Sequence, residues 1–288
     1  MTDGLIAVTG ATGGVGGRVA RRLADAGQWQ RLLVRDLGRA PRLAGAEVAR
    51  ASYDDPAAMR RALRGVHTLF LVSAHEHPDR VGLHTGTVDA AVDAGVERIV
   101  YLSFLGAAPD ATFTFARDHF HTEQHIRTTG VPFTFLRDSL YQDVLPSFAS
   151  RDGVIRGPAG RGRFAPVARD DVADVAVAVL RGDGHAGRTY GVTGPQLLTM
   201  ADVAELIGQA AGRPVRYLPE TLAEAYESRA GYDAPHWAVT GWVTSYAAIA
   251  AGELELVSDA VAEVAGHPPM SFAEFLAANP DSVAHLRG

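Results

Sequence analysis

Three glycines at three-residue spacing are the strongest chemical signal in the sequence. Gly10, Gly13 and Gly16 follow a short apolar run at residues 5–8 and precede an amphipathic run at residues 18–26. A buried strand, a glycine turn and a helix in this order are typical of dinucleotide binding. The first glycine allows a tight turn, the second lets the backbone approach a pyrophosphate, and the third lets the helix pack on the strand. The helix start then attracts phosphates through its free N–H groups and dipole. A plain structural turn is the alternative.

Arg35 is the residue that discriminates between two dinucleotides. It follows an apolar run at residues 31–34, about 20 residues after the last glycine, where the side chain that reads the ribose is expected. An acid there accepts bonds from the ribose of NAD, whereas a guanidinium fits the 2′-phosphate of NADP and can stack on adenine. We therefore expect NADPH to bind more tightly than NADH. Asp36 directly follows, Arg39 adds a second positive charge, and the alternative is that both arginines are solvated surface charges.

Predicted strands and helices alternate through the first half of the chain. Beyond the first strand and helix, apolar runs predict strands at residues 31–34, 46–51, 66–72, 98–102 and 133–137, and amphipathic runs predict helices at 54–64, 80–94 and 115–129. This alternation predicts an α/β fold, with a Rossmann-type doubly wound parallel sheet and right-handed crossovers.

The second half of the chain has a different pattern. Residues 151–164 are rich in glycine, arginine and proline, which predicts short strands and turns. Further strands are expected at 188–192 and 215–218, and helices at 167–180, 199–211, 219–230, 235–251, 258–265 and 271–278. We expect two domains: a dinucleotide-binding domain at 1–150, and a smaller, mostly helical substrate lobe at 151–288. Residues of about 163–192 should pack back on the first domain, with the lobe over the carboxyl edge of the sheet.

Composition excludes several classes of protein. The formal charge of −6 and the lack of a basic tract argue against nucleic-acid binding. No run is long enough to span a membrane, and the opening residues lack a signal-peptide pattern. The chain has no cysteine, which excludes disulfides, thiolate metal sites and a cysteine nucleophile. We expect a cytoplasmic protein with no membrane or nucleic-acid partner.

With these elements in place, the chain resembles the NmrA-like family of atypical short-chain dehydrogenase/reductases, and within it the branch of NADPH:quinone oxidoreductases and triphenylmethane reductases. The matching stretches lie at residues 8–16, 33–36, 53–66, 98–103, 119–125, 132–137, 164–172, 190–194 and 246–254, and so cover nearly the whole chain. Asp36 and Asp138 stand where the family often has asparagine, and both add negative charge near expected ligand sites.

The resemblance implies an NAD(P)H-dependent oxidoreductase that transfers hydride from NADPH to a quinone or similar electrophilic aromatic acceptor. Its expected cofactor-binding residues are Gly10, Thr12, Gly13, Gly14, Val15, Gly16, Arg35, Asp54, Ser73, Ala74, Ser103 and Phe104. The partner would be a small-molecule substrate, and the protein a monomer or homodimer. Two alternatives stay open: a non-catalytic NADP(H)-sensing regulator of the NmrA type, and a dedicated biosynthetic reductase.

The absence of lysine limits which residues can act as a general acid or base. It contains no lysine, so all 27 basic residues are arginines. Typical short-chain dehydrogenases use a tyrosine made acidic by a lysine four residues on, and that pair cannot exist here. Tyr101 lies within a predicted strand and is expected to pack in the core. Electrophilic acceptors need little help from a general acid, so proximity and orientation would then carry the rate.

His119 and Tyr141 are the candidate catalytic residues. His119 corresponds to the helix position that faces substrate in the wider family, and Tyr141 follows the sixth strand near the expected substrate mouth. A partly exposed helix histidine and an interlobe packing tyrosine are the respective alternatives. His121 and His125 lie four residues apart on one helix face, a spacing that can hold a metal. Because no third ligand stands at a defined spacing, we expect no metal site.

Overall fold

A seven-stranded parallel sheet organises the part of the chain that the computed structural model describes, residues 4–287. Residues 1–3, which are part of the segment where a signal-peptide pattern was expected to be absent, lie outside this range. The spatial order is β3-β2-β1-β4-β5-β6-β8, so β1 and β4 meet where the chain reverses its direction across the sheet. The strands are β1 (Ile6–Thr9), β2 (Gln30–Val34), β3 (Ala46–Arg50), β4 (Thr68–Val72), β5 (Arg98–Phe104), β6 (Phe133–Asp138) and β8 (Arg188–Val192). This confirms the predicted Rossmann-type, doubly wound fold.

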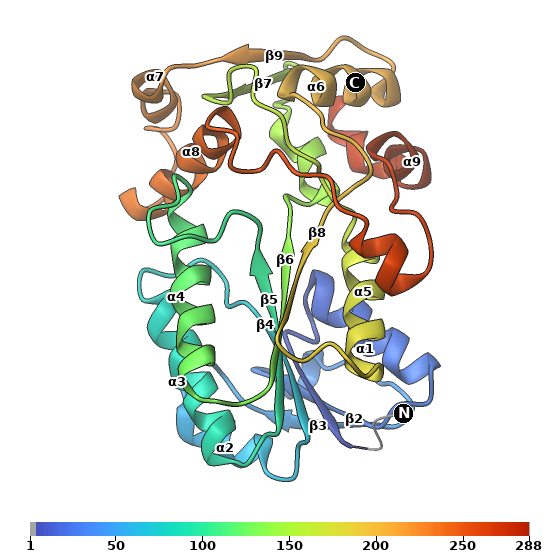
Figure 1. Cartoon of the computed structure of the whole chain (residues 1–288). Coiled ribbons are helices and arrows are strands. Elements are labelled where there is room, and N and C mark those ends of the chain that lie inside the picture. Colours follow the sequence, from blue (N-terminus) through green and yellow to red (C-terminus); the bar gives the residue numbers. More distant parts are fainter. Residues whose placement is uncertain (1–3, 288) are drawn as a thin grey trace.

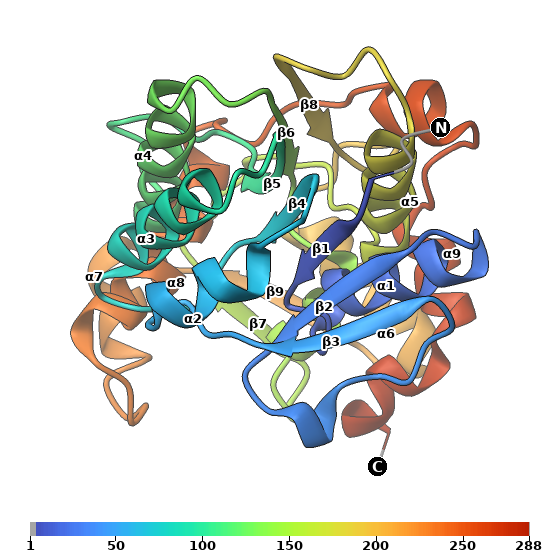
Figure 2. The ribbon, with the colours of Figure 1, turned by 90° about the horizontal axis from the view of Figure 1, so that it is seen from below.

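Helices cover both faces of the sheet, as buried parallel strands require. One layer holds α1 (Gly14–Asp25) and α5 (Arg169–Arg181), and the other holds α2 (Pro56–Leu63), α3 (Arg80–Asp93) and α4 (Thr114–Thr128). Figure 2 shows the sheet between these two layers. Each layer closes its own apolar core: Val19, Phe70 and Val175 belong to the first, and Met59 and Tyr101 to the second.

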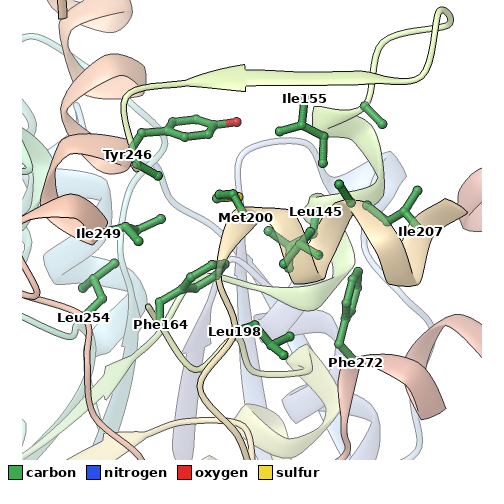
Figure 3. Close-up of a cluster of buried hydrophobic side chains, with 14 of the residues drawn as sticks. Leu145, Ile155, Phe164, Leu198, Met200, Ile207, Tyr246, Ile249, Leu254 and Phe272 are labelled. Atoms are coloured by element: carbon green, nitrogen blue, oxygen red, sulfur yellow. The ribbon is translucent and has the colours of Figure 1, made fainter. Parts of the chain in front are cut away.

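The remaining elements form a lobe over the carboxyl ends of β5, β6 and β8 (Figure 1). Its helices are α6 (Met200–Ala211), α7 (Leu222–Glu227), α8 (His236–Ala250) and α9 (Phe272–Ala278), beside a two-stranded parallel sheet of β7 (Val154–Gly157) and β9 (Arg216–Pro219). A further apolar cluster joins these elements around Phe164, Met200 and Tyr246 (Figure 3). Short 3₁₀ segments η1 (Leu37–Arg39), η2 (Gln142–Phe148) and η4 (Pro280–Leu286) complete the chain with the π-helical turn η3 (Val261–Ala265).

Several boundaries differ from the sequence predictions for identifiable reasons. Helix α5 begins at Arg169 and not at residue 167, because Val167 is extended and exchanges backbone hydrogen bonds with the segment 140–142. Strand β5 continues through Phe104, since the N–H of Leu105 still donates to the carbonyl of Asp138 on β6 (2.8 Å). Among the described residues, no helix has the length and apolar character that crossing a bilayer needs.

Candidate functional site

The glycine turn joins β1 to α1 with almost no room for side chains. Gly10 has φ +61°, a left-handed conformation that favours glycine, and its carbonyl accepts from the N–H of Gly13 (2.8 Å). A Cβ atom on Gly16 would lie 2.4 Å from the carbonyl oxygen of Gly10 and 2.7 Å from that of Thr9. The third glycine is therefore required for the close packing of α1 on β1.

The start of α1 is open to an anion. Its N-cap residue, Gly13, has no side chain to accept a hydrogen bond, and the first turn carries no acidic residue. The N–H groups of this turn have no intrahelical acceptor, and the helix dipole leaves a partial positive charge there. A phosphate group is the kind of ligand that this geometry binds.

A cavity of about 510 Å³ opens beside this turn, at the carboxyl ends of β1, β2 and β4. It lies where the strand order reverses, which is the usual ligand position in open α/β sheets. The predicted cofactor residues that line it are Gly10, Thr12, Gly13, Gly14, Gly16, Arg35, Asp54, Ser73 and Ala74. Tyr53, His75 and His77 line it too. Tyr53 closes one wall, because its hydroxyl donates to the carbonyl of Val72 and lies 2.9 Å from the hydroxyl of Thr9.

Arg35 stands exposed at the far end of this cavity. Two adjoining hollows extend it, one towards Arg50 and Arg61 and the other towards Arg39. The carboxylate of Asp54 also faces this region, and its pKa is lowered by a hydrogen bond from Ser52 and by the charge of Arg35. The end of the cleft that adenosine would occupy is thus rich in guanidinium groups, which suit a 2′-phosphate.

Three of the predicted cofactor residues lie away from the cavity lining. Val15 is buried in the core between α1 and the sheet. Ser103 is 1% exposed and donates to the carboxylate of Glu123 (2.6 Å), while the ring of Phe104 packs edge-on against Phe113. Ser103 and Phe104 both belong to β5, which extends two residues beyond the predicted strand at 98–102.

His119 is a member of a buried polar cluster and is not the partly exposed helix histidine of the alternative reading. It is 5% exposed, and its Nδ1 lies 2.9 Å from the hydroxyl of Tyr101. His84, from α3, approaches the same hydroxyl with its Nδ1 (3.4 Å), and the ring centres of His84 and His119 are 6.4 Å apart. Burial lowers the pKa of His119 well below its ordinary value and that of His84 to about 3, and the charge of Arg80 acts in the same direction. Both imidazoles are therefore neutral at physiological pH.

This cluster also fixes the end of β4. The backbone N–H of Ala74 donates to Nε2 of His84 (2.8 Å), and the carbonyl of Ala74 accepts from Nε of Arg80 (2.9 Å). The Nδ1 of His84 lies 2.8 Å from the hydroxyl of Thr122, and this hydroxyl donates to the carbonyl of Asp118. Because Ala74 lines the cavity, these contacts hold one of its walls rigid.

Tyr141 lies in a second cluster, on the opposite side of the sheet's carboxyl edge. Its hydroxyl donates to the carboxyl group of Asp138, which is 3% exposed, and the guanidinium of Arg169 lies 4.7 Å from its ring centre. Burial raises the pKa of Asp138 to about 8, against the opposing effects of Tyr141 and Arg169. Burial and the neighbouring Asp138 raise the pKa of Tyr141 well above its ordinary value. The pair therefore holds its protons at neutral pH.

His121 and His125, which have metal-capable spacing, take separate partners. His125 contacts Asp89 through Nε2 (2.7 Å), and the ring of His121 packs edge-on against Phe120. A different group, Asp171, Asp174 and His267, lies on the α5 face with ligand atoms within 4.8 Å of one another. Its two carboxylates accept hydrogen bonds from the N–H of Met270 and from Arg22.

Sequence reasoning missed the partners of both candidate catalytic residues. His84 and Tyr101 reach His119 from α3 and β5, and no local spacing relates these three positions. Arg169 meets Tyr141 because Val167 and Tyr141 form an isolated bridge between segments far apart in the chain. The only local signal for Arg169 was its place at the start of a helix that follows an extended, proline-containing segment.

The sequence profile of the NmrA-like family matches residues 2–233. The chain is similar to the NAD(P)H azoreductase of Xenophilus azovorans (34% identical, covering 96% of this chain and 98% of that protein) and to quinone oxidoreductase 2 of Escherichia coli (32%, covering 98% of each). Among solved structures, it is similar to the NADPH-dependent quinone oxidoreductase QOR2 of E. coli in complex with NADPH, with a TM-score of 0.87 at 30% identity over 95% of this chain and 99% of that one. The triphenylmethane reductase of Citrobacter sp. with NADP(H) gives a TM-score of 0.83 at 29% identity, over 98% and 99% of the two chains.

Proposed function

The chain belongs to the NmrA-like family, and on this premise we propose that it is an NADPH-dependent reductase of quinones and similar electrophilic aromatic compounds. The observation that carries the proposal is the cavity at the sheet's switch point. One end of it is a glycine cradle that a Cβ atom would obstruct, and the other is an arginine-rich hollow at Arg35. A dinucleotide with a third phosphate matches both ends. We further expect the protein to act in the cytoplasm as a monomer or homodimer.

The residues present fit this cofactor. Gly13 and Gly14 place no side chain at the start of α1, where the pyrophosphate would bind, Arg35 would contact the 2′-phosphate, and Ser73 and Ala74 line the cavity at the end of β4. When bound, the reduced nicotinamide supplies the hydride. The chain's own contribution is to hold the wall at Ala74 in place through His84 and Arg80.

The chain offers positioning more than strong acid catalysis. Tyr101 is fully buried and its pKa is raised by burial, so its hydroxyl is a poor proton donor and serves to orient Nδ1 of His119. His119 is neutral and can supply at most a weakly acidic N–H. Such a site suits an acceptor that is already electrophilic, because orientation then accounts for most of the rate. Quinones and cationic dyes have this property.

The test is oxidation of NADPH, followed by its absorbance, across a panel of quinones, azo compounds and cationic triarylmethane dyes. Turnover with members of this panel, and slower turnover with simple ketones, is the expected result. Tight NADPH binding without turnover of any acceptor would overturn the reductase assignment and favour the NADP(H)-sensing alternative. Turnover restricted to a ketone would favour a dedicated biosynthetic reductase.

A further inference from the structure

Arg169 reaches the glycine turn from a distant part of the chain. It is the first residue of α5, and α5 packs beside α1 on the same face of the sheet (Figure 1). A Cβ atom built on Gly14, the first residue of α1, would lie 3.0 Å from both Cδ and Nε of Arg169 and 3.3 Å from its Cζ. The side chain of Arg169 therefore packs against Gly14, one of the residues that line the cavity.

The surroundings of Arg169 favour the binding of an anion. The start of α1 carries the positive end of a helix dipole, and its first turn has no acidic residue. The nearest carboxylate, Asp143, lies 3.7 Å from Nη1 of Arg169. Asp143 also lies 3.3 Å from Nη2 of Arg18, which pairs with Asp170 as well (3.1 Å). At 3.7 Å the contact between Asp143 and Arg169 is too long for a hydrogen bond, so the guanidinium of Arg169 has N–H donors that a bound phosphate would accept from.

The side chain is also held before any ligand arrives. Its guanidinium lies over the ring of Tyr141, 4.7 Å from the ring centre, and its backbone N–H donates to Asp143 (3.0 Å). Two residues before Arg169, the backbone N–H of Val167 donates a hydrogen bond to the carbonyl of Leu140 (3.0 Å) and fixes the chain there. A guanidinium fixed in this way loses little freedom when it binds, which is the condition for a strong contact to phosphate.

We propose that Arg169 binds the pyrophosphate of the dinucleotide beside Gly14, and that the glycine turn and Arg169 together form the phosphate site. The inference rests on the proposed function and deepens it. It assigns the two ends of the cofactor to different arginines: Arg35 to the 2′-phosphate, and Arg169 to the diphosphate that NADPH and NADH share. Arg169 is a cofactor-positioning residue in this account.

The test is calorimetric titration of the wild type, Arg169→Ala, Arg169→Lys and Arg35→Ala with three ligands. The ligands are NADPH, NADH and adenosine 2′-monophosphate, which keeps the 2′-phosphate and lacks the diphosphate. Arg169→Ala should weaken NADPH and NADH by the same factor, about 10- to 100-fold, and leave adenosine 2′-monophosphate unchanged. Arg35→Ala should weaken NADPH and adenosine 2′-monophosphate and spare NADH. Arg169→Lys should lose less affinity than Arg169→Ala, because it keeps the charge without the bidentate geometry.

Arg181→Ala is the matched control, because Arg181 is the exposed last residue of the same helix. Thermal unfolding of each variant without ligand separates a folding defect from lost binding, and Arg169→Lys keeps the test usable if the alanine variant is unstable. Unchanged NADH affinity in a folded Arg169→Ala protein would overturn the inference while leaving the proposed function intact. Failure of the wild type to bind either dinucleotide would instead overturn the proposed function.

Discussion

Substitution of Asp138 by asparagine should change how the stability of the protein depends on pH. Burial raises the pKa of the Asp138 carboxyl to about 8, whereas an aspartate in an unfolded chain titrates near about 3.9. Between these values the native state holds one more proton than the unfolded state. The free energy of unfolding therefore falls as the pH rises, by up to about 1.4 kcal/mol per pH unit from this group alone.

The size of the effect follows from the width of the window. Roughly four pH units separate the two pKa values, which gives an upper bound of about 5–6 kcal/mol on the stability lost across it. Water entry and side-chain relaxation on ionisation reduce this value. Asparagine keeps an oxygen that can accept from the hydroxyl of Tyr141 and has no proton to lose. The free energy of unfolding of the variant, measured relative to that of the wild type at the same pH, should therefore increase as the pH rises from mild acid.

Urea unfolding followed by tryptophan fluorescence at a series of pH values across this window measures the difference directly. Asp110→Asn is the control, because it removes one exposed carboxylate at the surface. Parallel stability curves for Asp138→Asn and the wild type would refute the reasoning. They would mean that Asp138 is ionised throughout and that Arg169 compensates its charge.

Three further substitutions and one control test the cofactor cleft and the role of Tyr101. Arg35→Ala should weaken NADPH by about 10- to 100-fold in calorimetry and leave NADH nearly unchanged, while equal loss for both would make Arg35 structural. Gly16→Ala should destabilise the protein by about 1–3 kcal/mol in urea unfolding, because its Cβ would lie 2.4 Å from the carbonyl of Gly10. Gly86→Ala in α3, where the new Cβ would meet Pro56 at an ordinary 3.6 Å, should be neutral or stabilising. Tyr101→Phe should keep kcat within about tenfold of wild type in a folded protein, and a fall of 10²-fold or more would restore tyrosine acid catalysis.

The elements of the fold could be read from the sequence because their signals are local. Apolar runs of strand length placed the sheet strands within a few residues of their observed bounds, and glycine stops and aspartate caps marked the ends of helices. The family resemblance indicated the same topology. The glycine turn was readable for the same reason, since Gly10, Gly13 and Gly16 act within one strand–helix unit. The pairing of β7 with β9 was not, because these two four-residue strands meet across about sixty positions of the chain with little apolar alternation between them.

The chemistry of the site depends on contacts that no local pattern encodes. The spacing of His119 within α4 does not reveal that Tyr101 and His84 surround it, because those residues arrive from β5 and α3. Asp138 was noted as a departure from the family and as added negative charge. Its burial against Tyr141 raises its pKa and keeps it largely neutral, which only the packing of β6 against the segment after it could show.

Isotope transfer from NADPH to a dye shows directly whether this cleft performs hydride transfer. The protein would be given NADPH carrying deuterium on one face of C4 of the nicotinamide, together with a cationic triarylmethane dye, whose reduction places the transferred hydrogen on carbon where it does not exchange with water. Mass spectrometry of the leuco dye should find one deuterium per molecule from one C4 epimer and none from the other, because a cofactor fixed by the glycine turn, Arg35 and Ala74 presents a single face. Leuco dye without deuterium from either epimer, or NADPH bound without any dye reduced, would contradict direct hydride transfer in this cleft.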